Sequence, residues 1–316
     1  MNKEMQVLLT TKLDIARRLV SAGFEPVEVE EGDESLTGKL QLVHHGKYAN
    51  SLPPCVKTQT EYFAKGEGFY VINHIDADVI TAIAGLEGIK LDKKLVELIA
   101  EIDIHGKHAT NWTQHIQYAA RLMKFHRRVT EVYKKYSAEF KVMAVNITGD
   151  VVELIDILRS EIEENEAKEI VAQYEGLILK AVNEIVDTNG KVAFAIKNTD
   201  TESAGFEGYY RKAPIVIAYD RTKITIGVVS EEIAKKYFGQ NGLLQIVPLL
   251  NEKFGAGWGG RSTIIGSPRD KVYNREEAEK VFQLIAEIVN GTVCNICGLS
   301  INCHENGINP HGTKCF

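Results

Sequence analysis

The sequence predicts an α/β protein with a parallel-sheet domain, a helical connector, a second, smaller α/β domain and a Cys-rich C-terminal tail. Three observations support this fold class. Strands and helices alternate in the first half, an amphipathic charged stretch occupies the middle, and short apolar strands dominate beyond Gly190. With 316 residues, of which 44% are hydrophobic and 25% charged, the chain is long enough for two hydrophobic cores. The predicted boundaries are 1–160, 161–190, 191–290 and 291–316.

The first half is expected to supply strand, loop and helix units. Apolar side chains recur at helical spacing over 11–22 and 93–103. The segment 25–30 and the apolar run FYVIN at 69–73 predict strands. The stretch VITAIAGL at 79–86 predicts a helix, because small and apolar residues dominate it without turn formers.

Two long helical patterns are expected to lead into the second domain. Residues 112–137 and 150–186 are amphipathic and rich in Glu, Lys and Arg, and we place the linker inside the second. The segments KVAFAIKN, APIVIAYD and KITIGVVS then predict strands, with RTK joining the last two as a hairpin. Residues 231–251 and 275–290 predict helices.

Composition limits the classes of partner. A formal net charge of −6 and a pI near 5.9 provide no overall positive field, so duplex nucleic acid is not expected. The N-terminal segment has no apolar signal core, and no window approaches the roughly 18 apolar residues of a membrane span. We therefore expect a cytoplasmic protein without a membrane partner. The sequence leaves homodimer formation open.

Acidic and imidazole side chains alternate just after the FYVIN strand, at His74, Asp76 and Asp78. Open α/β sheets bind their ligands at the carboxyl ends of parallel strands. Carboxylate oxygens and imidazole nitrogens suit Mn²⁺, Mg²⁺ or Zn²⁺, so this loop predicts a divalent metal site. The alternative is an Asp-rich turn that caps the next helix, with His74 incidental.

Two further segments end in a glycine that permits a tight turn. They are VHHG, with His44 and His45, and EIDIHG, with Asp103 and His105. Taken singly, these are ordinary surface histidines and a helix cap. Together with the acidic loop they would offer enough ligands for two metals about 3.5–4 Å apart, which could activate water and neutralise a phosphoryl group.

The segment INHIDADVITA resembles the first motif of the DHH phosphoesterase superfamily. This superfamily includes RecJ-type exonucleases, oligoribonuclease/phosphoadenosine phosphatases, cyclic-dinucleotide phosphodiesterases and family II inorganic pyrophosphatases. The segment 213–270 is similar to the substrate-binding domain that accompanies the catalytic domain, including a Gly-Gly motif near its end. The two resemblances cover about half of the chain, in the order that the family uses.

The resemblance implies a metal site in the first domain, formed by His74, Asp76, Asp78, Asp103, His105, His44 and His45. One feature departs from the family pattern. The family's Asp-His-His motif lies downstream of the first motif, whereas the His-His pair here lies upstream and Val43 stands where the Asp would be.

A glycine-rich stretch, FGAGWGGRSTIIGSPR, predicts an anion cradle in the second domain. Glycines let backbone N–H groups approach an anion closely, serine hydroxyls add donors, and arginines bind phosphate or carboxylate with two parallel hydrogen bonds. The alternative is a glycine-rich hairpin with solvated arginines. The candidate substrate-binding residues are Gly259, Gly260, Arg261, Ser262, Ser267 and Arg269.

These observations predict a Mn²⁺-dependent (or Mg²⁺-dependent) phosphatase or phosphodiesterase that acts on a small nucleotide or short oligonucleotide in a cleft between two lobes. His105 or His45 would carry the proton. Two other functions stay open. One is a sensor that binds a nucleotide or cyclic dinucleotide after its metal loops have decayed, and the other is a metal-assisted hydrolase of a non-phosphate substrate.

The tail predicts a structural zinc site. Of the five cysteines, four fall at or after position 294, and Cys-x2-Cys is the spacing of a zinc knuckle. A flexible tail with incidental thiols is the alternative. The candidate zinc ligands are Cys294, Cys297, Cys303, His304, His311 and Cys315.

Overall fold

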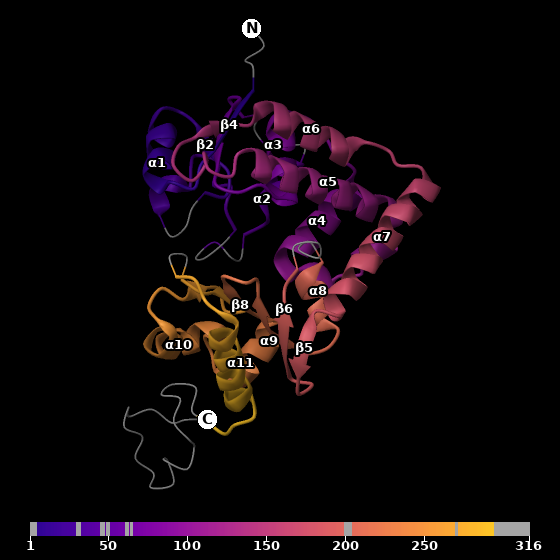
Figure 1. The fold of residues 1–316 in the computed structure, drawn as a ribbon. Coiled ribbons are helices and arrows are strands. Elements are labelled where there is room, and N and C mark those ends of the chain that lie inside the picture. The colour runs from indigo at the N-terminus through magenta and orange to yellow at the C-terminus, as the bar shows by residue number, and fades with distance from the viewer. Residues whose placement is uncertain are drawn as a thin grey trace. The chain divides into compact units, whose positions relative to one another are not determined.

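A computed structural model describes residues 5–29, 33–44, 48, 51–60, 63, 66–198, 204–268 and 271–293. The chain divides into two compact units, Met1–Ala172 and Gln173–Phe316. Each unit contains its own sheet and helices, so the protein is a mixed α/β protein (Figure 1). The predicted assignment of functions to four domains stays a prediction.

The sheet of the first unit has the strand order β2-β3-β1-β4. Strands β1 (Gln6–Leu9), β2 (Glu25–Pro26) and β3 (Phe69–Ile72) run parallel, whereas β4 (Val145–Asn146) pairs antiparallel with β1. The predicted parallel sheet is therefore parallel in its first three strands and mixed as a whole. Because β2 and β3 run in one direction, the segments that follow them leave the sheet at the same edge.

Strand β1 is absent from the sequence-based prediction. It is short and alternates half-buried with buried side chains, and a polar N-terminal segment precedes it. Its pairing with β3 over four residues makes it a central strand of the sheet. Strand β2 contains only Glu25 and Pro26 and is shorter than the predicted strand over 25–30; Val27 adds an isolated bridge to Leu42.

Helix α3 (Ala77–Leu86) is the buried helix of the first unit, and every residue from Asp78 to Leu86 is buried. The short helix α2 (Pro54–Thr58) packs against α3 so closely that a Cβ atom at Gly85 would lie 2.6 Å from the backbone oxygen of Thr58. Glycine at this position therefore allows the two helices to touch.

The other helices of the first unit are amphipathic, as their spacing predicted. In Figure 1, α5 and α6 lie side by side, in agreement with their residue contacts. The helices are α1 (Leu13–Ser21), α4 (Lys93–His105), α5 (Ile116–Lys135) and α6 (Thr148–Arg159), with 3-10 turns η1 (Glu34–Leu36), η3 (Lys107–Ala109) and η4 (Trp112–Gln114).

The predicted helix over 150–186 is two helices. Helix α6 ends where Ser160 adopts an extended backbone conformation, with φ −61° and ψ 137°. Helix α7 (Glu164–Val182) then starts afresh and contains the boundary between the two units. Helical spacing on both sides of the break made the sequence look continuous.

The sheet of the second unit has the order β5-β6-β7-β8-β10-β9. Strands β6 and β7 are parallel and the other neighbours are antiparallel, including the predicted hairpin of β7 and β8. The strands are β5 (Ile185–Thr188), β6 (Val192–Ile196), β7 (Ile215–Tyr219), β8 (Ile224–Val228), β9 (Gly259–Gly260) and β10 (Ile264–Gly266).

Helix α11 (Arg275–Val289) packs on this sheet, with the rings of Phe282 and Phe194 stacked at a centroid distance of 5.7 Å. The predicted helix over 231–251 is interrupted because Gly239 adopts a φ of +98° that ends α9. The remaining elements are α8 (Gly205–Tyr210), α9 (Glu231–Phe238), η6 (Gly242–Ile246) and α10 (Val247–Phe254).

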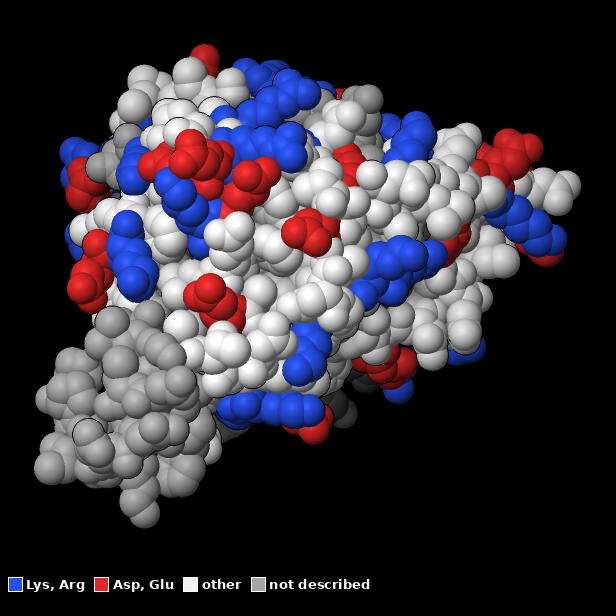
Figure 2. Space-filling model, turned by 60° about the horizontal axis from the view of Figure 1, so that its bottom comes forward, with Lys and Arg blue, Asp and Glu red and all other residues white. Residues whose placement is uncertain are grey.

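Charges of both signs alternate on the helices of the second unit. Ion pairs four residues apart join Lys235 to Glu231 at 3.1 Å and Arg275 to Glu279 at 2.7 Å. The face of the molecule in Figure 2 likewise shows Lys and Arg side chains interspersed with Asp and Glu. None of the helices in the described ranges is long and apolar enough to span a membrane.

Candidate metal centre

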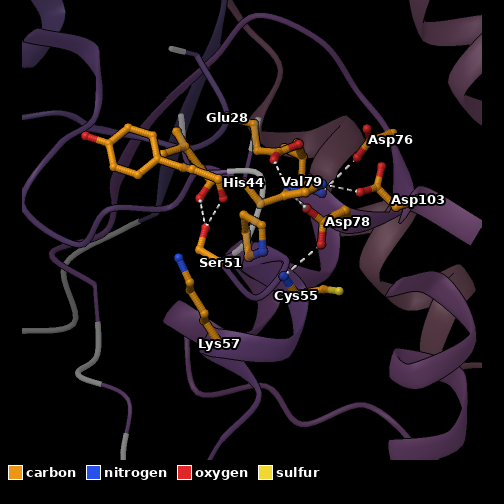
Figure 3. Close-up of polar contacts among 12 residues, drawn as sticks. Glu28, His44, Ser51, Cys55, Lys57, Asp76, Asp78, Val79 and Asp103 are labelled. Atoms are coloured by element: carbon orange, nitrogen blue, oxygen red, sulfur yellow. Dashed lines mark hydrogen bonds and ion pairs between the residues drawn. The ribbon is translucent and has the colours of Figure 1, made fainter. Parts of the chain in front are cut away.

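The acidic loop begins where β3 ends at Ile72, and α3 starts at Ala77. His74 and Asp76 therefore lie in the connection between a buried strand and a buried helix. Glu28 follows β2 at the same edge of the sheet, because β2 and β3 are parallel neighbours. Two strands thus direct the carboxylates of Glu28 and Asp76 toward one region (Figure 3).

Asp76 is both a helix cap and a neighbour of His74. Its Oδ1 accepts a hydrogen bond from the N–H of Val79 at 2.8 Å, which caps α3. Its Oδ2 lies 3.0 Å from Nε2 of His74. The two interpretations of this aspartate in the sequence are therefore compatible, because each uses a different oxygen.

The two oxygens of Asp78 likewise have different surroundings. The side chain is buried, and its Oδ1 accepts the N–H of Cys55 at 2.8 Å. Its Oδ2 lies 4.0 Å from Nδ1 of His44 and accepts no hydrogen bond within the described part of the chain. A buried carboxylate oxygen without a donor is costly, so this oxygen is suited to a cation.

Glu28 is a site residue that the sequence analysis missed. Its Oε1 lies 2.6 Å from Nδ1 of His44, and its Oε2 lies 3.6 Å from Nε2 of His74. The side chain is buried, and the backbone has a φ of +53°, a region that glutamate rarely adopts. Strained residues of this kind cluster at functional sites. The one signal in the sequence is an acidic residue at the end of a predicted strand.

His44 joins Glu28 to helix α4. Its Nε2 lies 2.6 Å from Oδ2 of Asp103, which stands near the C-terminal end of that helix. The structure thus brings together five of the predicted residues and Glu28. These five are His44, His74, Asp76, Asp78 and Asp103.

One of the two predicted proton carriers, His105, is not in this group. His105 is exposed at the end of α4, and no hydrogen bond or ion pair between described residues joins it to the cluster. His45 lies outside the described residues. Their proposed role in proton transfer therefore stays a prediction.

Burial and neighbouring charge act in opposite directions on the two histidines. Burial disfavours the imidazolium of His44, but hydrogen bonds to Asp103 and Glu28 outweigh it and raise its pKa to about 10. Burial likewise opposes the charge of His74, and its bonds to Asp76 and Glu28 raise its pKa to about 10. In the metal-free protein these imidazoliums supply positive charge that the carboxylates require.

The two imidazoliums do not balance the negative charge of the carboxylates around Asp78. Burial, followed by the nearby carboxylates of Glu28 and Asp76, raises the pKa of Asp78 well above its ordinary value. Among the described residues, Asp76, Asp78 and Asp103 form ion pairs with histidine alone. The cluster therefore contains four carboxylates and two imidazoles, and a bound cation would relieve their repulsion.

The ligand atoms form two overlapping sets that share Glu28. Glu28, His74 and Asp76 can each place a ligand atom within 4.8 Å of the others, and so can Glu28, His44 and Asp78. Carboxylate oxygens with imidazole nitrogens fit Mn²⁺, Mg²⁺ or Zn²⁺. The residues present thus fit a divalent metal, and the shared carboxylate fits a pair of ions.

Helix α2 borders this cluster with Cys55 and Lys57. Burial, reinforced by Asp78, raises the pKa of the Cys55 thiol, which therefore stays protonated. Nζ of Lys57 donates to the carbonyl oxygen of Gln41 at 2.9 Å. Burial lowers the pKa of Lys57, while the carboxylates of Asp78 and Glu28 oppose this shift, so its ammonium lies within the field of the site.

The glycine-rich stretch of the second unit forms a short hairpin of β9 and β10. Gly259, Gly260 and Arg261 are exposed, as both interpretations require. Ser267 is buried and its Oγ accepts the N–H of Ile224 at 3.0 Å, so this hydroxyl oxygen supports the sheet. Ser262 donates to Oε1 of Glu231 at 3.2 Å.

Part of the predicted anion cradle has an internal acceptor. The N–H groups of Gly257 and Trp258 both donate to Oδ1 of Asn251, at 2.9 and 3.0 Å. Arg269 and the predicted zinc ligands lie outside the described residues. Substrate binding by this hairpin and zinc binding by the tail stay predictions.

Comparisons with known proteins add little to this geometry. No protein-family model and no curated protein matches the chain. Among solved structures, the chain is similar to the pGpG-specific phosphodiesterase PggH from Vibrio cholerae, with 14% identity, a TM-score of 0.37, and coverage of 90% of this chain and 99% of that one. A second similarity is to an uncharacterized protein from Helicobacter pylori G27, with 14% identity, a TM-score of 0.22, and coverage of 71% and 69%. TM-scores this low do not establish a shared fold.

Proposed function

We propose that the protein is a divalent-metal-dependent phosphoesterase whose ions are held by Glu28, His44, His74, Asp76, Asp78 and Asp103. The observation that carries this proposal is the geometry of Asp78. Its buried Oδ2 accepts no N–H or O–H hydrogen bond among the described residues, and it faces a shared set of carboxylate and imidazole atoms. A cation is the partner that such an oxygen lacks.

A phosphoester is the substrate class that the site chemistry favours. The resemblance of INHIDADVITA to the first motif of the DHH superfamily supports the same class, and we propose a divergent DHH fold for the chain. Small nucleotides and short oligonucleotides are the proposed substrates. When bound, divalent ions would neutralise phosphoryl charge and lower the pKa of a coordinated water.

Side chains of the site would position the metal ions and bind the phosphate. Asp76 and Asp78 each anchor one oxygen on a backbone N–H and present the other to the cluster. This anchoring fixes the carboxylates before a ligand arrives, so little reorganisation is needed. Lys57 would contact a phosphate oxygen, because its ammonium carries three donors and Gln41 accepts one of them.

The sensor with decayed metal loops is less well supported. Decay of the loops would remove or scatter their ligating groups. Instead, His44 and Asp103 lie 2.6 Å apart, and His74 and Asp76 lie 3.0 Å apart. The glycine-rich hairpin, through Arg261, is the proposed contact for a substrate anion in the second unit.

Hydrolysis assays test the proposal. Purified protein should release phosphate or nucleotide from a phosphoester panel with Mn²⁺, and EDTA should abolish the reaction. Asp76→Asn and Asp78→Asn should each lower kcat by about a hundredfold or more. Absence of divalent-dependent hydrolysis across mononucleotides, dinucleotides and short oligonucleotides would contradict the proposal.

A further inference from the structure

The side chain of Tyr133, on helix α5, contacts the acidic loop. The phenol oxygen of Tyr133 accepts a hydrogen bond from the backbone N–H of Ile75 at 2.7 Å. Ile75 stands between His74 and Asp76, so the bond lies at the centre of the loop. Ile75 is 5% exposed, so this turn packs against the protein interior.

The position of Tyr133 is itself fixed by packing. Its ring packs at 5.7 Å from the ring of Phe140, which is buried. The backbone oxygen of Phe140 accepts the N–H of Thr11, just beyond the end of β1. Tyr133 therefore links the ends of two neighbouring parallel strands: it bonds to Ile75 after β3 and packs on Phe140, which is bonded to Thr11 after β1.

The other side-chain hydrogen bonds of the loop, among the described residues, do not involve the N–H of Ile75. Asp76 caps α3 through Val79, and the ring of His74 contacts Asp76 and the Oδ1 of Asn73, the latter at 2.5 Å. These contacts orient side chains. The Tyr133 bond is the side-chain contact that holds the peptide N–H between the two proposed ligands.

We propose that Tyr133 is a positioning residue that sets the spacing of His74 and Asp76 for metal binding, an inference that rests on the proposed metal centre. The hydroxyl does not bind the ion. It holds the peptide between His74 and Ile75, one residue before Asp76, so its loss lets the turn between the two ligands move. Partners that orient metal ligands from outside the coordination sphere typically change metal affinity by about 10–100-fold.

The variant Tyr133→Phe tests this role in the full-length protein. It keeps the ring and its packing on Phe140 but removes the acceptor of the Ile75 N–H. Titration calorimetry with Mn²⁺ should give a Kd about tenfold higher than that of the unchanged protein. In the metal-free protein, NMR should show about tenfold faster hydrogen exchange at the Ile75 amide, because its acceptor is gone.

Tyr136→Phe is the matched control, at the C-cap of the same helix. Its hydroxyl contacts Oδ2 of Asp150 at 2.9 Å and no residue of the proposed centre. This variant should leave the Mn²⁺ affinity and the Ile75 exchange rate unchanged, even where it lowers Tm. Equal loss of Mn²⁺ affinity in both variants would indicate general destabilisation and overturn the inference.

The outcomes separate this inference from the proposed function. Unchanged Mn²⁺ affinity in Tyr133→Phe, with the unchanged protein binding Mn²⁺, overturns the positioning role alone. Absence of divalent-ion binding in the unchanged protein overturns the metal centre. Unaltered exchange of the Ile75 amide in Tyr133→Phe overturns the positioning role whether or not metal binds.

Discussion

Nε2 of His44 lies 2.6 Å from Oδ2 of Asp103, and this contact joins a loop after the sheet edge to a helix far along the chain. The same imidazole contacts Glu28 through Nδ1. One ring therefore bridges two acidic groups from separate elements. Such a ring supplies in the metal-free protein part of the charge that a divalent ion would supply.

The variant Asp78→Asn should increase the stability of the metal-free protein and weaken its metal binding. Burial makes the ionised carboxylate unfavourable, so the isosteric amide should raise the unfolding free energy of the metal-free protein by about 1 kcal/mol. It should also abolish the rise in Tm that Mn²⁺ produces in the unchanged protein. Thermal unfolding with and without Mn²⁺ measures both effects.

Asp150→Asn is the control for this prediction. Asp150 is also buried, but Nη2 of Arg128 lies 2.6 Å from its Oδ1 and Nζ of Lys135 lies 3.2 Å from its Oδ2. Loss of these charge-assisted bonds should lower stability by about 2 kcal/mol and leave the Mn²⁺ response intact. A similar destabilisation by both amides would show that Asp78 is an ordinary structural carboxylate.

Lys57→Met should weaken substrate binding without weakening metal binding. The change removes an ammonium within the field of Asp78 and Glu28 and keeps most of the side-chain volume. We expect KM for a phosphoester to rise about tenfold, while the Mn²⁺ Kd does not increase. Lys57→Arg, which keeps the charge, should recover most of the affinity. An unchanged KM in Lys57→Met would exclude contact with the phosphate.

Gly85→Ala should damage the contact between α2 and α3. The added methyl group would lie 2.6 Å from the backbone oxygen of Thr58, which cannot move as a flexible side chain could. We expect a loss of about 2 kcal/mol in urea unfolding, together with weaker Mn²⁺ binding, because α2 supplies the N–H that anchors Asp78.

Gly176→Ala gives the opposite expectation within helix α7. Nothing lies within 4 Å of the added Cβ atom, and alanine favours a helix over glycine by about 1 kcal/mol. The free energy of unfolding should therefore increase. Stabilisation by both substitutions would contradict the tight packing inferred at Gly85.

His126 should make the protein less stable in mild acid. Burial, reinforced by the Lys107 ammonium, lowers the pKa of His126 well below its ordinary value of 6.5. Below about pH 6.5, His126 is therefore protonated in the unfolded chain but stays neutral in the folded protein. The contribution of neutral His126 to the free energy of unfolding is complete above this pH and decreases below it. One proton bound over one pH unit corresponds to about 1.4 kcal/mol, so the loss from this group at pH 5.5 is at most about that amount.

The variant His126→Gln isolates this effect. Urea unfolding at pH 7.5 and pH 5.5 should show a smaller loss of stability in the variant than in the unchanged protein. Equal losses in the two proteins would assign the acid sensitivity to other groups.

Local features of the fold were predictable, and pairing between distant segments was not. The hairpin of β7 and β8 follows from two apolar runs and a short polar turn, and α3 follows from its small and apolar residues. The central strand β1 was missed because its four residues form a strand through parallel pairing with β3, which is distant in sequence. Helix breaks at Ser160 and Gly239 were also missed, because the helical spacing continues on both sides.

The same distinction holds at the candidate site. His74, Asp76 and Asp78 could be grouped from sequence, because they follow one strand within a few residues. Glu28 could not, since its approach to His44 and His74 depends on a left-handed backbone and on the pairing of β2 with β3. An acidic residue in the run VEVEEGDE looks like part of a solvated loop.

The most direct test of the metal centre is anomalous X-ray diffraction from crystals of the full-length protein soaked in Mn²⁺. Two anomalous peaks should lie among the six side chains, with Glu28 contacting both and with His74 and His44 at opposite sides. Crystals that contain bound Mn²⁺ elsewhere, with no peak within coordination distance of Asp78, would contradict the account.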